Sequence, residues 1–459
     1  MRVVKLYIGA GLLALMLMGC QQTISERPPT FDELMALADK NLAKTDLIKS
    51  YIYSQKDGVG FQNVMAQAET GDTKAELMAC YLLITGTGVE ENDSLGYNLC
   101  QKAAEKGSAP AKANLIYRDF NDDPEHMNWQ ETYDAFEDML KSDPSIAHRG
   151  MQFLYRQNHP KASGFMMYYH LNQAIKYKNT NAMLALSEID LHTRSKRNQN
   201  PKRAEKNLKR AYRLNDFDAG FKLALEYREG RILEKNTAEY VSMIKHMAAF
   251  LHPQSMGELA SIYQTGTGAE QDDDKAKALY SQAAKFGHPR SQLIVARELL
   301  FGPVDSRDYP TGVRYLETQA ENGSIEAMTG LADHYAGPEI DDPENKSVIW
   351  LSKAAMLGDE SSQERLGFGM METGYIEAMQ PYIQVLETAQ KTGSPDASYL
   401  LARHYRAASG VPRDLLKAKS ILDEVEYLND PRITQEADII EGYISHFGSI
   451  EAVPDIINL

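Results

Sequence analysis

The feature that most constrains this 459-residue chain is a repeated spacing of small and apolar residues. Marker positions recur every 35 to 37 residues, and they are Gly71, Gly107, Asp143, Lys178, Asn215, His252, Gly287, Gly323, Gly358 and Gly393. Four places after each marker stands a small or apolar residue: Ala75, Ala111, Ala147, Ala182, Ala219, Met256, Ser291, Ala327, Ser362 and Ala397. Alanine also stands four places before seven markers, at Ala103, Ala174, Ala211, Ala248, Ala283, Ala354 and Ala389. Two helical stripes in a period of this length are typical of stacked helix hairpins, so the sequence predicts an all-α superhelical solenoid of about ten hairpins.

The repeat register also predicts how the chain is organised. Its continuity removes the need for a domain boundary, although a chain of this length ordinarily forms several domains. Before the repeats, helical patterning begins near Phe31, and Thr30 is a candidate N-cap. After the repeats, a last helix pair starting at Thr434 is expected to close the array. The predicted segments are N-terminal capping helices over 31–63, the repeat solenoid over 64–429 and C-terminal capping helices over 430–459.

The start of the chain predicts export. Two basic residues, Arg2 and Lys5, precede an apolar run from Leu6 to Met18 that is too short to span a bilayer as a finished helix. The run ends in Leu17-Met18-Gly19-Cys20, which resembles the lipobox of bacterial lipoproteins. In such lipoproteins the cysteine is lipidated and becomes the new first residue.

The lipobox resemblance implies where the protein is located. It predicts a signal peptide over 1–19 and a lipidated tether over 20–30, with acyl chains on Cys20. Gln21 follows the cysteine, in place of the aspartate associated with inner-membrane retention. We therefore expect an outer-membrane anchor that faces the periplasm, held by several acyl chains on one cysteine.

Charge and cysteine content narrow the partners and the redox state. The formal net charge of −15 makes nucleic acid an unsuitable partner. After lipidation of Cys20 two cysteines remain, Cys80 and Cys100, on the two helices of one predicted hairpin. In an oxidising compartment they form either a disulfide that pins the hairpin or two buried thiols, and the sequence leaves both alternatives open.

Three kinds of stretch identify the repeat type. The segments Trp350–Gly358 and Gln101–Gly107 resemble the second-helix consensus of Sel1-like repeats, W-x-x-K-A-A-x-x-G. The turn between helices resembles the family's G-x-G-V-x-x-D pattern in Gly86–Asp93, and related turns stand at Gly266–Ala269 and Gly410–Asp414. The best matches cover 64–118 and 245–428, whereas the middle part, 119–244, keeps the spacing but lacks the glycines. This resemblance implies a Sel1/TPR-like solenoid that binds other proteins.

The layout of the whole chain resembles one group of Sel1-like proteins, the scaffold lipoproteins of alginate secretion. That resemblance implies a non-catalytic outer-membrane scaffold whose partners are a β-barrel exporter, periplasmic polysaccharide-modifying proteins and an acidic polysaccharide. Sel1-like lipoproteins also include regulators of peptidoglycan enzymes and of envelope stress signalling, which we keep as an alternative.

A basic segment interrupts the otherwise acidic chain. Its cations are Arg194, Lys196, Arg197, Lys202, Arg203, Lys206, Lys209, Arg210 and Arg213. If 202–213 is helical, most of these cations share one side of the helix. The segment is either a binding surface for an acidic partner protein, a polyuronate chain or anionic head groups, or a solvated helix face. It extends from a predicted basic loop, His192 to Pro201, and an acidic loop is expected at Asp119 to Trp129.

No catalytic, cofactor or metal motif stands out. The chain lacks H-E-x-x-H, G-x-S-x-G and Gly-Lys-Ser/Thr sequences, and its eleven histidines form no pair at metal-ligand spacing. The acidic runs Asp272–Asp274 and Asp341–Glu344 lack the alternating ligands of a calcium loop. We therefore expect no cofactor, no bound metal and no enzyme activity. An enzyme with a site in the middle repeats is the remaining alternative, and its candidate histidines are His148, His159, His170 and His192.

Overall fold

The computed structural model consists of helices joined by short turns, and no β-strand occurs in the part of the chain that it describes. That part comprises 27–39, 44–56, 58–123, 128–157, 163–193, 199–337, 340, 342, 346–359, 361–362, 365, 383–384, 386–388, 390–391, 394–407, 411–425, 427 and 430–447. The predicted signal peptide and Cys20 lie outside it. None of the described helices is both long and apolar enough to cross a membrane. The described residues form two compact units that meet in sequence after His288, and we describe each by itself.

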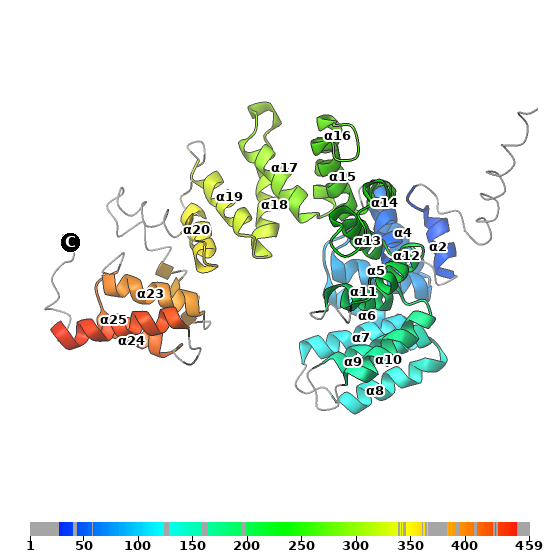
Figure 1. The fold of residues 1–459 in the computed structure, drawn as a ribbon, viewed down its shortest axis with the longest axis horizontal. Helices are drawn as coiled ribbons and strands as arrows, with labels where there is room; N and C mark the ends of the chain where they lie inside the picture. Colours follow the sequence, from blue (N-terminus) through cyan, green and yellow to red (C-terminus); the bar gives the residue numbers. More distant parts are fainter. Residues whose placement is uncertain are drawn as a thin grey trace, which may run out of the picture. The chain divides into compact units, whose positions relative to one another are not determined.

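Unit 1, up to His288, is a succession of antiparallel helix hairpins after three shorter helices (Figure 1). Its elements are α2 (Phe31–Asp39), α3 (Thr45–Ser54), α4 (Val59–Glu69), α5 (Thr73–Thr85), α6 (Asp93–Glu105), α7 (Ala109–Asp122), α8 (Trp129–Asp138), η1 (Met139–Lys141), α9 (Pro144–Arg156), α10 (Gly164–Lys176), α11 (Thr180–His192), α12 (Pro201–Tyr212), α13 (Phe217–Glu229), α14 (Thr237–Ala249), α15 (Pro253–Thr265) and α16 (Asp273–Lys285). The predicted acidic loop is shorter than expected, because α7 continues to Asp122. The predicted basic loop has the expected ends, His192 and Pro201.

Unit 2 continues with the same kind of hairpin. Its elements are α17 (Pro289–Phe301), η3 (Val304–Ser306), α18 (Tyr309–Glu321), α19 (Ile325–Tyr335), α20 (Lys346–Met356), α23 (Pro395–Ala407), α24 (Leu415–Asp423) and α25 (Pro431–Phe447). The last helix begins at Pro431, three residues before the predicted Thr434, because proline fits the first turn of a helix. Its expected partner helix lies outside the described residues.

Side-chain caps explain where the helices begin. Thr30 and Glu33 form a reciprocal cap: Glu33 N donates to Thr30 Oγ1, and Thr30 N donates to the Glu33 carboxylate. This confirms Thr30 as an N-cap. Before most first helices of the hairpins, a side chain accepts a hydrogen bond from a backbone N–H of the first turn, and these capping residues are Asp72, Ser108, Asp143, Asn179, Asp216 and Ser324. His252 stands at the same position before α15 and accepts no such bond.

Left-handed residues turn the chain from one hairpin into the next. Five of the marker glycines, from Gly71 to Gly358, have a positive φ between 83° and 95°. In three repeats without a marker glycine, Lys178, Asn215 and Leu251 take the same conformation with φ of 63°, 63° and 59°. The marker assigned to His252 was therefore one residue too late, because Leu251 makes the turn and His252 begins the next helix. The repeat at Asp143 differs, because Ser142 and Asp143 have φ of −97° and −145° and neither is left-handed.

The predicted alanine stripes form the core. All ten residues placed four positions after the markers are buried, from Ala75 to Ala397. The described alanines placed four positions before the markers are buried as well, and Ala389 lies outside the described side chains. Small residues let the helix axes approach closely. Tyr227 and Tyr405 are buried, as expected for core tyrosines, whereas Tyr155 and Tyr335 are only half-buried.

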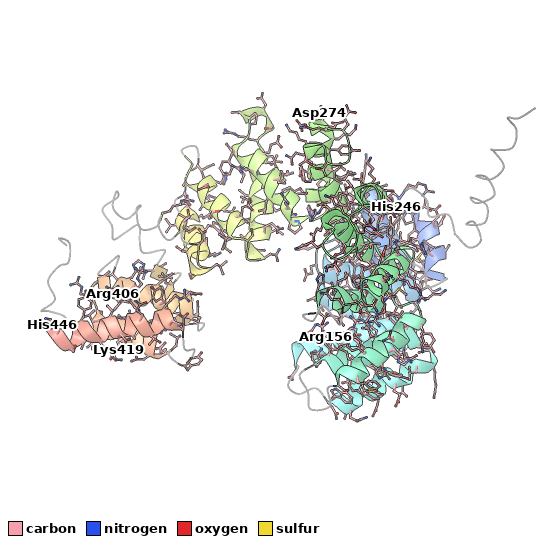
Figure 2. All side chains as sticks on the ribbon, in the orientation of Figure 1. Arg156, His246, Asp274, Arg406, Lys419 and His446 are labelled. Atoms are coloured by element: carbon pink, nitrogen blue, oxygen red, sulfur yellow. A yellow bond between two sulfur atoms is a disulfide. The ribbon has the colours of Figure 1, made fainter. Side chains whose placement is uncertain are left out.

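Ion pairs join the first helices of successive hairpins at equivalent positions. Arg228, the penultimate residue of α13, pairs with Glu258 of α15. In unit 2, Arg406 is the penultimate residue of α23 and pairs with Glu436 of α25 at 2.5 Å (Figure 2). Both glutamates occupy the same place in their helices. The periodicity therefore extends from the apolar core to charged contacts between hairpins.

The N-terminal helices of unit 1 pack against repeats that follow much later in the chain. The backbone N–H of Phe217, at the start of α13, donates to Asp46 Oδ2 of α3 at 2.7 Å. The rings of Tyr53 and Phe286 stack with centroids 4.3 Å apart. One hydrophobic cluster contains side chains of both segments. In Figure 1 the blue helices accordingly lie beside the green helix α13.

Candidate functional site

The basic segment forms a helix whose cations lie opposite its buried face. Helix α12 buries Ala204, Asn207, Leu208 and Ala211 against the repeat. Its N-cap is Asn200, whose side chain accepts a hydrogen bond from Arg203 N. The prediction that 202–213 is helical is confirmed up to Tyr212, and Arg213 is the C-cap. Arg194, Lys196 and Arg197 lie outside the described residues.

Two cations of α12 are engaged within the protein. Arg203 donates from Nε and Nη2 to both carboxylate oxygens of Asp190, at 2.7 and 2.6 Å. Those hydrogen bonds raise the pKa of Arg203, and the nearby phenol of Tyr168 contributes as well. Lys209 pairs with Glu205 at 2.8 Å, and Glu205 also accepts from the Tyr227 hydroxyl. Arg203 and Lys209 therefore stabilise the hairpin, and their internal ion pairs limit their binding to a partner protein.

Four other cations point to solvent. Lys202, Lys206 and Arg213 are exposed, and Arg210 is half-buried. Within the described ranges, no carboxylate forms an ion pair with any of them. The accessible part of the basic segment is therefore smaller than the sequence predicted, and it lies on one side of one helix.

Exposed aromatic rings lie on α10, the second helix of the preceding hairpin. Phe165, Tyr168 and Tyr169 follow helical spacing on α10, and the ring of Phe165 is 79% exposed. The opposite side of α10 is buried through Leu171. The phenol of Tyr168 contributes to the raised pKa of Arg203 at the N-terminal end of α12. Sequence reasoning missed these rings, although three aromatic residues at spacings of three and four in a polar context are a readable signal.

The two cysteines of the chain's first complete hairpin are joined. Cys80 of α5 and Cys100 of α6 form a disulfide, with their Cα atoms 5.4 Å apart. Both residues are fully buried. The structure therefore has the first of the two alternatives that the sequence left open.

Two of the four candidate histidines for an enzyme site are neighbours. The Nδ1 atoms of His148 and His170 are 3.1 Å apart, and the ring of His170 also stacks on Tyr155. Burial, together with the charge of His148, lowers the pKa of His170 to about 4. His192 lies elsewhere, 4.0 Å from Glu226, and His159 lies outside the described residues.

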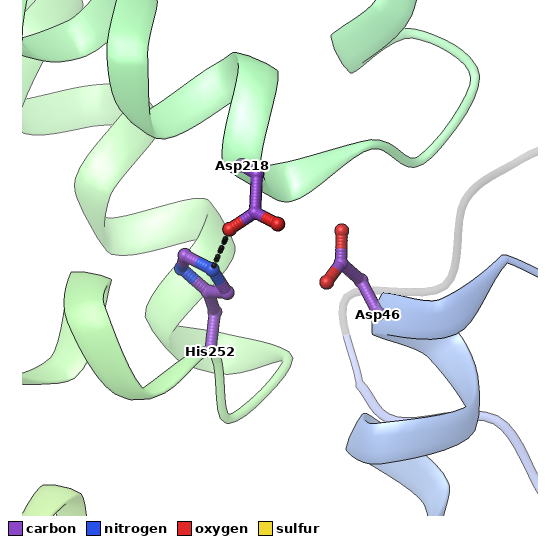
Figure 3. A group of neighbouring side chains, drawn as sticks. All are labelled: Asp46, Asp218 and His252. Atoms are coloured by element: carbon purple, nitrogen blue, oxygen red, sulfur yellow. Dashed lines mark hydrogen bonds and ion pairs between the residues drawn. The ribbon is translucent and has the colours of Figure 1, made fainter. Parts of the chain in front are cut away.

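A second group of titratable side chains comes from three segments of unit 1 (Figure 3). Asp46 belongs to α3, Asp218 to the first turn of α13, and His252 precedes α15. One ligand atom of each lies within 4.8 Å of the others. Sequence spacing could not reveal a group spread over two hundred positions. One local signal was present, since His252 replaces the Asp, Asn or Ser that caps most first helices.

Comparison with known protein families agrees with the repeat. The Sel1 repeat family matches residues 73–108, 181–216, 253–288, 325–359 and 395–421. The chain contains Sel1 repeats. The match at 181–216 corrects the expectation that the best repeats avoid 119–244, because Asn215 supplies the left-handed turn there without glycine. Sel1 repeats mediate protein–protein interaction, so this Sel1-repeat protein is a protein-interaction scaffold.

Curated relatives share part of this Sel1-repeat chain. A chitin synthase regulator of Saccharomyces cerevisiae is 30% identical over 174 residues, which are 35% of this chain and 25% of the relative. Chitin synthase regulatory factor 3 of Schizosaccharomyces pombe is 30% identical over 205 residues, which are 41% of this chain and 22% of the relative. The chain thus spans only a small part of the length of these relatives.

Solved Sel1-type structures are similar over more of the chain. A protective antigen present in uropathogenic Escherichia coli, with an SLR fold, has a TM-score of 0.43 and 19% identity, and the match covers 83% of this chain and 82% of that one. A Sel1 repeat protein from Oxalobacter formigenes has a TM-score of 0.47 and 20% identity, and the match covers 68% of this chain and 91% of that one.

Proposed function

We propose that this Sel1-repeat protein is a lipid-anchored, non-catalytic scaffold that holds envelope proteins of exopolysaccharide synthesis and secretion. The observation that carries the proposal is an exposed surface on the second helices of two successive hairpins, which is aromatic on α10 and cationic on α12. We call this surface the aromatic–cationic surface, and its residues are Phe165, Tyr168, Tyr169, Lys202, Lys206, Arg210 and Arg213. Aromatic residues and arginine dominate the binding energy of many interfaces.

Charge favours an acidic partner at this surface. The chain as a whole carries a formal net charge of −15. The four cations of this surface are a local exception, because they form no ion pair with a carboxylate of the described residues. Such a cluster attracts an acidic region of a partner protein and fixes its orientation. The exposed rings add apolar area at the same place, which a solvated helix face does not require.

The location in the envelope rests on the start of the sequence. In the proposal the chain is cleaved before Cys20, lipidated there and anchored in the outer membrane, with the repeats in the periplasm. The disulfide between Cys80 and Cys100 supports an oxidising compartment, because such bonds are rare in the reducing cytosol.

The link to polysaccharides has two supports. The layout resembles the scaffold lipoproteins of alginate secretion. The relatives that share part of the chain are named as regulators of chitin synthase, which makes a polysaccharide. We therefore propose that the partners are an outer-membrane β-barrel exporter and periplasmic polysaccharide-modifying proteins.

Cross-linking in cells tests the proposal. The lipidated protein is cross-linked, purified from outer membranes, and its partners are identified by mass spectrometry. The triple variant Lys202→Glu, Lys206→Glu, Arg210→Glu should lose the partner that binds the aromatic–cationic surface. A matched variant, Lys102→Glu, Lys112→Glu, Lys245→Glu, changes the net charge equally at three separated exposed positions and should keep it. Equal recovery with both variants would contradict the role of this surface.

A regulator of peptidoglycan enzymes or of envelope stress signalling is the second candidate. The relatives favour it in one respect, since they are named as regulators of an enzyme and not as secretion scaffolds. Recovery of peptidoglycan synthases or stress sensors in the same experiment, with no exporter, would select this candidate.

A further inference from the structure

Three helix N-termini of unit 1 bring together two carboxylates and an imidazole. Asp46 is the second residue of α3, Asp218 is the second residue of α13, and His252 is the N-cap of α15. Their ligand atoms lie within 4.8 Å of one another. Figure 3 shows the carboxylates of Asp46 and Asp218 facing each other, with the imidazole beside them.

The imidazole is held in a fixed orientation. His252 Nδ1 lies 2.8 Å from Ser255 Oγ, and Nε2 lies 3.4 Å from Asp218 Oδ1. The rings of Phe217 and Phe221 pack against it. With its proton on Nδ1, the ring donates to Ser255 and turns the lone pair of Nε2 towards the two carboxylates. A hydrogen bond that fixes the second nitrogen is the usual support of a histidine ligand to a metal.

The group also satisfies the requirements of burial and access. The His252 side chain is 4% exposed, whereas that of Asp218 is 64% exposed, so an ion could enter past Asp218. Asp46 is held from behind, because its Oδ2 accepts the N–H of Phe217 at 2.7 Å. Ligand atoms around one ion with bonds of about 2.1 Å lie about 3 to 4 Å apart, so the group closes around an ion by a shift of less than about 1 Å.

Positive charges also surround the group. They offer an alternative to a metal ion, because they could balance the charge of the two carboxylates. Lys49 of α3 is near both carboxylates, and Lys44 is near Asp216, which caps α13. The three helix N-termini add partial positive charge.

We propose that Asp46, Asp218 and His252 bind a divalent transition-metal ion that fastens helix α3 to the starts of α13 and α15. Two oxygen ligands and one imidazole nitrogen suit Zn²⁺, with water completing the coordination. Ca²⁺ fits less well, because it takes six to eight oxygen ligands. The ion joins the N-terminal helices to repeats about 170 residues later in the sequence, where it would add to the shared hydrophobic cluster and to the Asp46–Phe217 hydrogen bond.

Metal binding by the full chain tests the proposal. The protein is treated with EDTA, and Zn²⁺ is titrated by calorimetry at pH 7.5. We expect one Zn²⁺ per chain, with a dissociation constant at or below about 1 μM. Asp46→Asn and Asp218→Asn should each weaken binding by about 100-fold, and Ser255→Ala by about 10-fold. Excess Ca²⁺ should not displace Zn²⁺.

The matched control is Asp274→Asn. Asp274 is the second residue of α16, as Asp218 is of α13, and it is exposed. This variant should bind Zn²⁺ as the unchanged protein does. Circular dichroism verifies that each variant folds. Hydrogen exchange of 45–54 gives a second measurement, which Zn²⁺ should slow in the unchanged protein and in Asp274→Asn but not in Asp46→Asn or Asp218→Asn. Absence of a single tight site, or Asp46→Asn and Asp218→Asn binding like Asp274→Asn, would overturn the proposal in favour of carboxylates balanced by Lys49 and the helix ends.

Discussion

Asp190 of α11 and Arg203 of α12 form a bidentate ion pair, and Asp190 is 1% exposed. The pair turns an arginine of the basic segment into a structural residue. Removing one partner of such a pair leaves a buried charge without a counter-ion, and that is strongly destabilising.

Arg203→Ala should lower the free energy of unfolding by about 2 to 4 kcal/mol, because the buried Asp190 carboxylate loses its counter-ion. Lys206→Ala, on the same helix but exposed and without an ion pair, should change it by less than about 0.5 kcal/mol. Urea unfolding followed by circular dichroism measures both values. Equal effects of the two substitutions would show that the ion pair contributes nothing beyond a surface charge.

The disulfide between Cys80 and Cys100 should be a main source of stability in the α5–α6 hairpin. It closes a loop of 20 residues, for which the loss of chain entropy predicts a contribution of about 3 kcal/mol. The double variant Cys80→Ser, Cys100→Ser should be destabilised by about that amount. Mass spectrometry after alkylation of the unfolded, unreduced protein checks the bond itself: two alkylated cysteines at these positions would show that it does not form.

Lys178 occupies a left-handed turn that glycine fits better. With φ of 63°, its side chain crowds the backbone, so Lys178→Gly should stabilise the protein by about 1 kcal/mol. Lys176, two residues earlier, is exposed and helical, and Lys176→Gly should destabilise by about 0.5 to 1 kcal/mol. Thermal unfolding of the two variants should therefore show shifts of opposite sign. A shift of the same sign would mean that the turn is not left-handed.

His170 should make unit 1 less stable in mild acid. Burial first, and His148 second, lower the pKa of His170 to about 4, below the ordinary value near 6.5 of the unfolded chain. The unfolded state therefore binds more protons between these values. The contribution of His170 is fully present above about pH 6.5 and is lost as the pH falls towards 4.

Urea unfolding at pH 7.5 and pH 5 measures this dependence. His170→Phe removes the titrating group and should reduce the difference in unfolding free energy between the two pH values by about 1 to 2 kcal/mol. Asp46 has the opposite pH dependence, because its raised pKa favours folding in acid. This contribution is the same in His170→Phe and in the unchanged protein, so it cancels when the two proteins are compared. An unchanged difference would place the pKa of His170 near its ordinary value.

The repeat determined how much of the fold was predictable. Spacing alone identified the buried stripe from Ala75 to Ala397, because each hairpin makes the same contact with its neighbour. It misplaced the turn at Leu251, since a left-handed leucine has no sequence signal. It also overstated the basic surface, because the partner of Arg203 lies on another helix and the carboxylate could not be located without packing.

The contacts of Asp46 were beyond local reasoning. A repeat period predicts which hairpins are neighbours in the stack. Each hairpin is also rotated slightly relative to the previous one, and the accumulated rotation decides whether the first helices contact α13 and α15. The metal-ligating group therefore follows from curvature and not from any motif.

The packing of α3 on α13 and α16 has a consequence for how unit 1 folds. An open stack of repeats unravels from its ends, and each added repeat stabilises only its neighbour. In unit 1 the first helices also contact residues that follow about 170 to 230 positions later, so the two ends of the stack stabilise each other. Loss of a repeat in the middle should therefore loosen the beginning of the protein, and unit 1 should unfold as one cooperative block instead of peeling from its N-terminal end.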